Sequence, residues 1–485
     1  MGYMDKYLPA SNVTAGNITI PSAATPFDPA SILVLIVTLC AFCAPVFVLF
    51  PPFPPRKSDA LPITHTRLGL QPSKSNLRDH HRVAEHASPG AAAEVKSLFI
   101  YPIKSCRGIE VTRAKVVHTG LEFDRLFTFA QLKSPSPAGA DGDQAKGDHV
   151  WEFITQRQFP LLATVEVELW QPDLDKIRGG ERETKSDETF LVLRFPSRRS
   201  GLAGALQSFA AKCSRGWRAV PEEEVLLPVA FPSAGEITAK GYARERVRVW
   251  KDTATALNLG SELPDELRRY LGVSNPLGLF RIDPAGLRPV FKCAPVKDEA
   301  GYQPVVSFQD SYPIHVLGLS SVQDLETQVK KDANLDKLDP KRFRANIFGL
   351  CMPSSDLCRT LRTYRILTEG PTVVSGSPAY DEDSWTKIRL TDPSHKEDQS
   401  DFHVSCRTTR CKLPNVNPDT GIRHNVEPDR TLRANREIDE AAPKKGCLGM
   451  QVTPLFDKPE STESYLAVGM SIEVLQRGQH FFKSV

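Results

Sequence analysis

Hydrophobic and polar residues alternate in several short runs along the chain from about residue 94 onward. Four of these runs cover residues 95–103, 163–170, 190–195 and 246–250. A period of two places one face of a strand against a core and the other face toward water. Because turn residues separate the runs at short intervals, the pattern predicts a sheet or barrel built of short strands.

Two segments show the spacing of apolar residues that is typical of helices. One covers residues 263–271, and the other runs from about Ser320 to Lys330. Gln323 stands three residues after Ser320, which is the arrangement of a capping box, so we predict that Ser320 opens this helix. The predicted fold class is therefore mixed α+β, with a β-barrel core and flanking helices.

Residues 31–50 form an uncharged apolar run of about 20 residues, the length that crosses a bilayer. The polar tail before it, residues 1–30, lacks the basic start of a signal peptide, so the run predicts an uncleaved transmembrane helix. Basic residues are more frequent after the run than before it, which places the C-terminal body in the cytosol by the positive-inside rule. Asn12 and Asn17 begin glycosylation sequons, and their use is left open.

A linker is expected between this anchor and the folded body. Residues 51–93 begin with a proline-rich stretch and continue as a polar segment, a composition typical of a stiff and then flexible tether. The folded part is then expected to begin near Glu94.

The overall composition excludes several classes of protein. The net charge of +3 arises from nearly balanced acidic and basic residues, which speaks against a broad nucleic-acid surface. The ten cysteines are too scattered for a disulfide scaffold. The sequence also contains neither the glycine-rich fingerprint of dinucleotide-binding proteins nor a P-loop.

Cys411 lies in the most informative stretch of the sequence. Arg410 precedes it, and the turn-forming residues 417–421 follow shortly after. A neighbouring guanidinium favours the thiolate, the form of cysteine that ligates soft metals or attacks as a nucleophile. The alternative is that Cys411 is a small buried hydrophobe, which is the commoner role of an isolated free cysteine.

Other polar residues stand where predicted strands or helices begin or end. Lys104 and Ser105 follow the first strand, where they offer a cation and a hydroxyl to a phosphate, and Arg125 supplies a second cation. Taken singly, each such residue is more often solvated, paired with a neighbour, or a cap. The remaining boundary positions are Thr155, Arg157, Gln158, Asp310, Ser311, Arg344 and Asn346.

The order of these motifs along the chain resembles the MOSC domain family, and most of all its mitochondrial amidoxime reducing components. The resemblance covers roughly residues 94–478, and the ordered set is more specific than any one motif. The motifs are Tyr101-Pro-Ile-Lys-Ser, Asp124-Arg125, Thr155-x-Arg157-Gln158, Asp310-Ser-x-Pro313, Phe343-Arg-x-Asn346, Glu382-Asp-x-Trp385 and Arg410-Cys411 with Asn417-Pro-Asp-Thr-Gly421.

This resemblance implies a domain order and a cofactor. A MOSC N-terminal β-barrel domain is expected at 94–304, the MOSC domain at 305–478, and a short tail at 479–485. The implied cofactor is molybdenum bound to molybdopterin, with Cys411 as the metal ligand and no pyridoxal phosphate. By the same resemblance, the pterin and its phosphate are held by Lys104, Ser105, Arg125, Thr155, Arg157, Ser311, Arg344, Asn346 and Arg410.

The chain also departs from the family pattern. Ala345 stands where the family often has proline, and residues 351–380 form an insertion that we expect to reshape the mouth of the site. Cys406 lies five residues before Cys411, where family members often have a cysteine three residues before it. We therefore predict that Cys406, like Cys351 and Cys358, is structural.

The predicted function is reduction of N-hydroxylated compounds such as amidoximes and hydroxylamines by a membrane-anchored molybdenum enzyme. Asp310 is the candidate for orienting water or relaying a proton, and a carboxylate that only holds Arg344 is the alternative. A different class of function is a molybdenum-cofactor carrier or a sulfur-transfer protein in which Cys411 carries persulfide sulfur. A third alternative is a membrane-tethered protein that binds the cofactor without turnover.

Electrons must come from another protein, because the sequence shows no haem, flavin or iron–sulfur motif. The family resemblance implies cytochrome b5 and NADH-cytochrome b5 reductase as the donors. It also implies the mitochondrial outer membrane, with the endoplasmic reticulum as the alternative.

Overall fold

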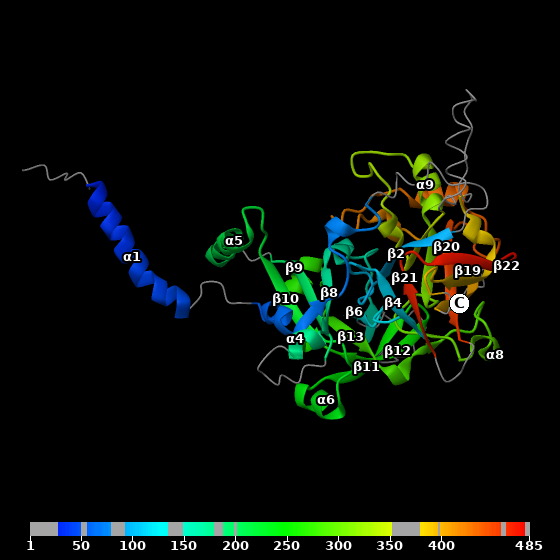
Figure 1. Cartoon of the computed structure of the whole chain (residues 1–485), viewed down its shortest axis with the longest axis horizontal. Coiled ribbons are helices and arrows are strands. Elements are labelled where there is room, and N and C mark those ends of the chain that lie inside the picture. The colour runs from blue at the N-terminus through cyan, green and yellow to red at the C-terminus, as the bar shows by residue number, and fades with distance from the viewer. Residues whose placement is uncertain are drawn as a thin grey trace, which may run out of the picture. The chain divides into compact units, whose positions relative to one another are not determined.

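A computed structural model divides the chain into two units, residues 1–55 and residues 56–485. The structure describes residues 28–49, 56–78, 93–133, 149–178, 188–197, 201–351, 379–395, 398–456 and 462–480. Its first unit contains helix α1 (Pro29–Leu49), and every other element named below belongs to the second unit (Figure 1).

Helix α1 coincides with most of the predicted transmembrane run. Among the residues that the structure describes, however, no helix is both long enough and apolar enough to cross a membrane. The prediction of a transmembrane helix at 31–50 is therefore not supported, and neither is the single-pass placement that depended on it.

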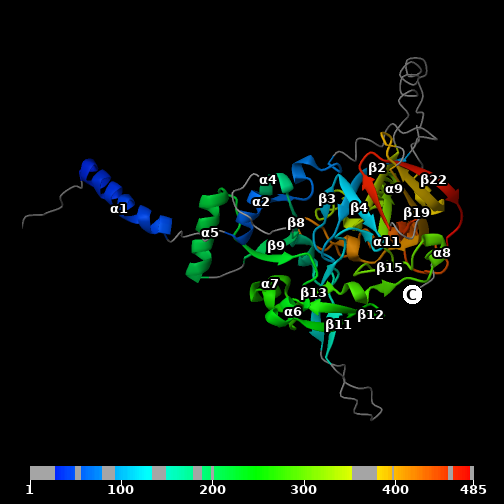
Figure 2. The ribbon, with the colours of Figure 1, turned by 60° about the horizontal axis from the view of Figure 1, so that its bottom comes forward.

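A closed five-stranded barrel forms one part of the second unit, in the order β11-β12-β13-β6-β7. Apolar side chains fill it, among them Val247 and Val249 of β11, Phe153 of β7 and Phe280 of β13, so the period-two pattern of the sequence does mark a buried face. Helix α6 (Ala234–Lys240) lies beside β11 in both views (Figures 1 and 2). The strands are β6 (Phe127–Lys133), β7 (Val150–Phe153), β11 (Ala243–Val249), β12 (Asp252–Asn258) and β13 (Leu277–Ile282).

The largest sheet follows the order β17-β16-β20-β19-β18-β22-β2-β3. Strand β17 also pairs with β2, so the strands from β17 to β2 form a ring. Strand β2 thus pairs with β22, a strand from the far C-terminal part of the chain. The bounds are β2 (Ala93–Ile100), β3 (Ile109–Val111), β16 (Ile314–Gly318), β17 (Ile347–Cys351), β18 (Trp385–Thr391), β19 (Gln399–Thr409), β20 (Cys447–Leu455) and β22 (Ser471–Arg477).

Three smaller sheets complete the second unit. The four-stranded sheet β1-β8-β9-β10 includes β1 from within the predicted linker, so part of residues 51–93 is folded rather than a free tether. Its strands are β1 (His65–Arg67), β8 (Glu166–Pro172), β9 (Phe190–Pro196) and β10 (Glu222–Pro228). The others pair β14 (Arg288–Pro289) with β15 (Val305–Val306), and β21 (Glu463–Ala467) with β4 (Arg113–Val117) and β5 (Gly120–Leu121).

Helices flank these sheets, so the predicted mixture of β-barrels and helices is confirmed. The two predicted helices appear as α7 (Asp265–Leu271) and α9 (Leu319–Gln328). The other α-helices of the second unit in the described residues are α2 (Leu61–Thr64), α4 (Leu174–Arg178), α5 (Gly201–Arg215), α6 (Ala234–Lys240), α8 (Lys297–Ala300) and α11 (Asp429–Asn435).

The predicted capping box of α9 is wrong. Gly318 is the N-cap residue, and no side chain caps the helix from that position. Instead, the buried carboxylate of Glu382 accepts hydrogen bonds from the Gly318 N–H at 3.1 Å and from the Ser321 hydroxyl at 2.8 Å. Glu382, which is distant in the sequence, therefore supplies the acceptor that the free N–H groups at a helix start require. The sequence around α9 itself does not reveal this partner.

Gly120 in β5 allows a close approach that positions one wall of the site. Its φ is +112°, and a Cβ atom built there would lie 2.7 Å from the carbonyl oxygen of Pro313, in the loop that carries Asp310. Gly120→Ala should therefore lower the free energy of unfolding by about 2–4 kcal/mol, through backbone strain plus overpacking. Urea denaturation measures this change.

Gly469→Ala is the matched control for Gly120→Ala. Gly469 also has a positive φ of +92°, but within the described residues, its two chain neighbours aside, no atom lies within 4 Å of its built Cβ. Gly469→Ala should lower the free energy of unfolding by only about 1–2 kcal/mol, because it adds backbone strain without overpacking. Equal losses in the two variants would show that the contact with Pro313 does not constrain the fold.

Candidate active site

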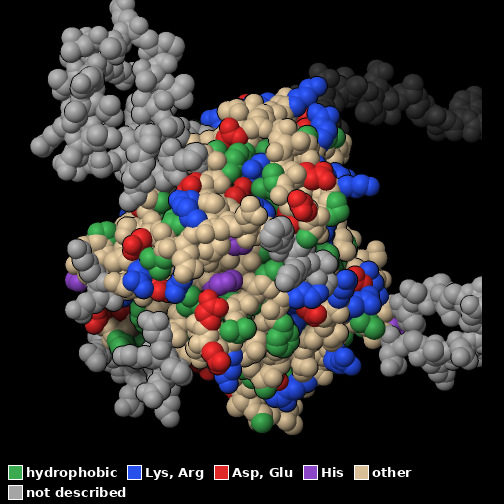
Figure 3. Space-filling view, turned by 90° about the vertical axis from the view of Figure 1, so that its right-hand side faces the viewer, with side chains coloured by type: hydrophobic (Ala, Val, Ile, Leu, Met, Phe, Trp, Pro, Cys, Tyr) green, Lys and Arg blue, Asp and Glu red, His purple; other side chains and the backbone are tan. Residues whose placement is uncertain are grey.

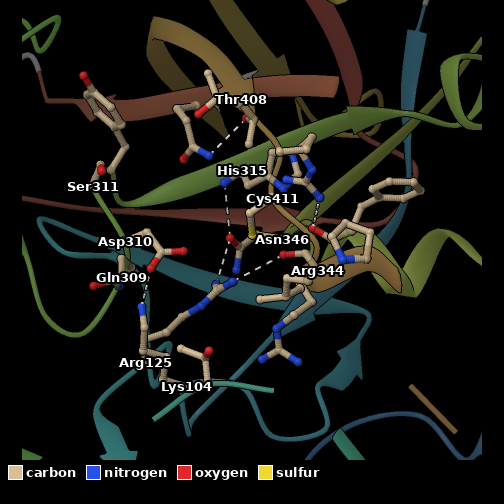
Figure 4. Close-up of a pocket in the computed structure, with 18 of the residues that line it drawn as sticks. Lys104, Arg125, Gln309, Asp310, Ser311, His315, Arg344, Asn346, Thr408 and Cys411 are labelled. Carbon is tan, nitrogen blue, oxygen red and sulfur yellow. Dashed lines mark hydrogen bonds and ion pairs between the residues drawn. The ribbon is translucent and has the colours of Figure 1, made fainter. Parts of the chain in front are cut away.

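All the residues that the sequence analysis predicts for the site line one pocket (Figure 4). The ends of β2, β7 and β19 and the starts of β6, β16 and β17 surround this pocket. The predicted residues lie just outside these strand ends. The structure thus brings together side chains that are more than three hundred positions apart in the sequence, such as Lys104 and Cys411. They are Lys104, Ser105, Arg125, Thr155, Arg157, Asp310, Ser311, Arg344, Asn346, Arg410 and Cys411.

The pocket is strongly basic although the chain is nearly neutral. On the outer face seen in Figure 3, acidic and basic side chains are interspersed. In the pocket, by contrast, Asp310 is the single carboxylate among the lining residues. Such a cluster of cations favours an anionic ligand. The basic lining residues are Lys104, Arg125, Arg157, Arg344, Arg407 and Arg410.

Several lining residues have a left-handed backbone conformation. Ser105, Arg125, Trp250 and Arg344 have φ values of 69°, 50°, 59° and 52°, respectively. Such values are uncommon for residues other than glycine, and they persist where surrounding contacts hold the backbone in place. Their concentration around one pocket is a sign of function that is independent of the side chains.

A buried carboxylate, that of Asp124, organises the floor of the site. It accepts hydrogen bonds from the Tyr101 backbone N–H at 2.8 Å, the Asn346 side-chain amide at 3.1 Å and the Arg125 guanidinium at 2.5 Å. The Asp124 side chain is fully buried. Asn346 in turn accepts from Arg125 at 3.0 Å and from the His315 backbone N–H at 3.2 Å. The network therefore joins the ends of β2, β5, β16 and β17.

Lys104 and Asp310 form an ion pair at the mouth of the pocket. The Lys104 ammonium donates to the Asp310 Oδ1 atom and to the Phe308 carbonyl, both at 2.7 Å. Burial lowers the pKa of Lys104 to about 8, although Asp310 favours its charged form. Burial alone would raise the pKa of Asp310. The Lys104 ammonium and the hydrogen bond from the Trp250 N–H have the larger effect, and they hold the pKa of Asp310 well below its ordinary value. Asp310 therefore pairs with Lys104, and the alternative that it holds Arg344 is wrong.

Arg344 and Arg410 each keep a buried donor for which the described part of the chain supplies no acceptor. Arg344 donates to the Cys106 carbonyl at 2.6 Å and lies over the Tyr101 ring, while Arg410 donates to the Phe343 carbonyl at 2.6 Å. Among the described residues, nothing accepts from the buried Arg344 Nη2 or Arg410 Nε. Burial lowers the pKa of each guanidinium to about 10, which still leaves both charged at neutral pH.

Arg125 is less available to a ligand than its neighbours, because its guanidinium also donates to the Arg344 carbonyl at 3.3 Å. Lys104 retains one of its three N–H donors after its two contacts. The predicted assignment of Lys104, Ser105 and Arg125 to a phosphate therefore stays a prediction. The unpaired donors of Arg344 and Arg410 offer the pocket further positions for an anion.

Cys411 lies just after the end of β19, next to Arg410, and has an exposed side chain on the pocket wall. It is thus not the buried hydrophobe that was the alternative. Cys406 also lines the pocket but is fully buried, and burial raises the pKa of its thiol. This burial fits the structural role predicted for Cys406. Cys358 and the side chain of Cys351, like most of the insertion at 351–380, lie outside the described residues.

Sequence reasoning missed several lining residues. His315 is buried in the wall, burial lowers the pKa of its imidazole well below the ordinary value, and no described residue bonds to its Nε2 atom. Trp250 stands at the turn between β11 and β12. The one sequence signal for Trp250 was its position at the end of a predicted strand. No pattern in the sequence indicated that His315 belongs to the site. The other lining residues missed include Arg407, Thr408 and Gln451.

The described residues contain no group of three or more His, Cys, Asp or Glu side chains arranged around a metal ion. A metal whose other ligands come from a bound organic group needs a single protein donor, and the exposed Cys411 thiol is placed to be that donor.

Comparison with protein families matches residues 92–200 to the MOSC N-terminal beta barrel domain and residues 303–473 to the MOSC domain. These matches together span more than half of the chain. The chain belongs to the MOSC domain family. The predicted resemblance is confirmed at this level.

The chain is also similar to curated relatives of the MOSC family. Mitochondrial amidoxime reducing component 2 of Rattus norvegicus is 25% identical over 375 residues, which cover 76% of this chain and 79% of the relative. Mitochondrial amidoxime-reducing component 1 is 22% identical in Mus musculus, over 71% of this chain and 72% of the relative. Mitochondrial amidoxime-reducing component 1 of Homo sapiens is 23% identical, over 72% of this chain and 74% of the relative.

The Asp124 network should be essential to this MOSC fold. Asp124→Asn removes a charge that is fully buried beside Arg125, so the free energy of unfolding should fall by about 3 kcal/mol or more. Glu463→Gln is the control, because the Glu463 side chain is 53% exposed and its ion pair with Lys115 should contribute less than about 1 kcal/mol. Similar small losses in both variants, measured by urea denaturation, would contradict this role of Asp124.

The lowered pKa of Lys104 should appear as a pH dependence of anion binding. Sulfate keeps its charge from pH 7 to pH 9, whereas Lys104 loses its proton around pH 8, so sulfate should bind several-fold more weakly at pH 9. Calorimetric titration of cofactor-free protein measures this. Lys104→Arg should show no such dependence, because a guanidinium stays charged throughout. If sulfate affinity fell equally with pH in the wild type and in Lys104→Arg, Lys104 would be excluded from the anion site.

Proposed function

We propose that this MOSC protein binds a molybdenum cofactor in the pocket and reduces N-hydroxylated compounds such as amidoximes. The observation that supports this most is the exposed Cys411 thiol on the wall of a pocket lined by six cationic side chains. The printed names of the relatives, which are amidoxime reducing components, support the same reaction.

The residues present fit the proposed cofactor. Its anionic phosphate requires several hydrogen-bond donors, and the unpaired groups on Arg344, Arg410 and the Thr155 hydroxyl are buried at the pocket without a partner among the described residues. Cys411 would supply the single protein thiolate to the metal, and a soft sulfur ligand suits a metal already bound by sulfur. When bound, the cofactor supplies two-electron redox chemistry and oxygen transfer.

The protein residues then have to deliver protons. Reduction of an N–OH group to N–H consumes two electrons and two protons and releases one water molecule. The Lys104–Asp310 pair stands at the mouth, with its donor and acceptor 2.7 Å apart. We assign to it the transfer of protons between solvent and the substrate oxygen, because a lysine whose pKa is about 8 exchanges protons readily near neutral pH.

The electron donors remain part of the proposal. A cytochrome b5 with an NADH-cytochrome b5 reductase is the donor system that the family resemblance implies. The relatives are named as mitochondrial proteins, which supports a mitochondrial location for this chain.

Cys411→Ala tests the proposal. In the system reconstituted with cytochrome b5 and its reductase, the variant should reduce benzamidoxime no faster than a reaction without the protein, because the metal has lost its protein ligand. Cys213→Ala is the matched control, since Cys213 is also an exposed free cysteine but lies on α5, outside the pocket. It should keep wild-type activity.

Two results would contradict the proposed reductase. One is benzamidoxime reduction by Cys411→Ala at the wild-type rate. The other is wild-type protein that contains no molybdenum but carries added sulfur on Cys411, detected by mass spectrometry. The second result would favour the sulfur-transfer function instead.

A further inference from the structure

Helix α5 carries a surface of exposed apolar side chains outside the pocket. The helix joins β9 to β10 and projects from their sheet in both views (Figures 1 and 2). Its side chains Leu206 and Phe209 are 68% and 65% exposed. Trp217 and Val220, in the segment that leads from α5 to β10, are 83% and 54% exposed. Large apolar side chains that gather on one surface in this way mark a site of contact with a partner.

The two sides of α5 differ in burial. Gly204 and Ala211 are two helical turns apart, and both are buried. Each residue of a helix is rotated by about 100° from the one before it, so Leu206 and Phe209 lie together on the opposite side. The helix therefore packs through its small residues and presents its large apolar side chains outward.

The segment around α5 is also basic. Between Ser197 and Val220 the sequence contains five basic residues and no acidic residue. Lys212 and Arg218 have exposed side chains, and the Lys212 ammonium lies 5.0 Å from the centre of the Trp217 ring. Positive charge thus stands directly beside the exposed indole, and the same surface combines apolar and cationic side chains.

The nearest acidic residues along the chain do not neutralise this charge. Residues 222–224 at the start of β10 are glutamates. The first, Glu222, pairs with Arg56 at 3.0 Å, and the last, Glu224, pairs with Arg194 at 3.1 Å. Because these carboxylates are matched by cations of their own, the surface of α5 keeps its positive charge.

We infer that the outward side of α5, together with Trp217, binds the surface of a membrane that contains anionic lipids. Leu206, Phe209 and the indole enter the boundary between head groups and acyl chains, and Lys212 and Arg218 contact the lipid phosphates. Helices with Leu, Phe or Trp on one side and flanking Lys or Arg residues bind membrane surfaces in this way. Tryptophan in particular favours the level of the head groups, where its ring is apolar and its N–H is hydrated.

The charge of this surface favours a membrane over a second copy of the chain. In a two-fold contact the same patch of both copies meets itself. Two surfaces with the same excess of positive charge would then face each other, which opposes association. An anionic membrane has the complementary charge. The inference does not depend on the proposed reaction, because α5 contributes no residue to the pocket.

Tryptophan fluorescence tests this contact in the full-length protein. The first tryptophan of the chain is Trp151, so lipid quenching of tryptophan does not report on contacts made by residues 1–150. Vesicles of phosphatidylcholine brominated on its acyl chains, mixed with phosphatidylserine, should quench the fluorescence. Vesicles without phosphatidylserine should quench it several-fold less, and high salt should reverse the quenching. Trp217→Phe should abolish the quenching that depends on phosphatidylserine.

Two double variants separate the apolar from the charged contribution. Leu206→Ser with Phe209→Ser, and Lys212→Glu with Arg218→Glu, should each lower the affinity for phosphatidylserine vesicles by about tenfold or more. Both should keep the wild-type free energy of unfolding, because the four side chains are exposed. Phe291→Ser is the matched control, since Phe291 is 72% exposed but lies between β14 and α8, and it should bind vesicles like the wild type.

Each remaining outcome would overturn the inference. Equal quenching by neutral and anionic vesicles would exclude the charged contact, and unchanged quenching in Trp217→Phe would place the lipid contact elsewhere. Unchanged affinity in either double variant would exclude the side chains that it replaces. Sedimentation of the lipid-free protein tests the other occupant. A dimer that dissociates when Leu206 and Phe209 are replaced, without quenching by vesicles, would show that a second copy covers α5 instead.

Discussion

The buried carboxylate of Asp124 is the interaction on which the site depends. It holds the Tyr101 backbone, the Arg125 guanidinium and the Asn346 amide within 3.1 Å, at the place where strand ends from distant parts of the chain meet. A fully buried charge is stable only when its partners remain in place. The network therefore fixes the relative positions of β2, β5, β16 and β17, and with them the loops that carry the pocket residues.

Two cations of the pocket, Arg344 and Arg410, are held in place by neutral groups, whereas Lys104 and Arg125 pair with the carboxylates of Asp310 and Asp124. Aromatic rings and backbone carbonyls support Arg344 and Arg410, so their charges are positioned but not neutralised. Guanidinium charges that no carboxylate neutralises favour the binding of an anionic ligand. The Cys411 thiol on the same wall lets one pocket combine anion binding with a soft metal ligand, which is the combination that the proposed cofactor requires.

Much of the site could be predicted from residue types at strand ends. Lys104, Asp310, Arg344 and Cys411 stand at boundaries of periodic segments, and the order of their motifs indicated the family before any contact was known. The partners of these residues could not be predicted, because they depend on tertiary contacts. Asp310 pairs with Lys104 and not with Arg344.

The capping of α9 and the position of Trp250 could not be predicted, because both depend on tertiary contacts. Glu382, some sixty residues beyond the start of α9, supplies the acceptor at the helix start that a capping box at Ser320 was expected to supply. The long apolar run at 31–50 reads as a membrane span in the sequence, yet no described helix meets the requirements for one. Trp250 lies at the turn between two strands of the closed barrel, where its indole N–H donates to Asp310, a residue sixty positions away.

The most direct test of the account is the metal and pterin content of the folded protein. Full-length protein purified from cells supplied with molybdate should contain about one molybdenum atom per chain, together with an oxidised pterin released on denaturation. Elemental analysis and fluorescence of the released pterin measure both. Folded protein that contains neither, from cells in which other molybdenum enzymes are loaded, would contradict the account.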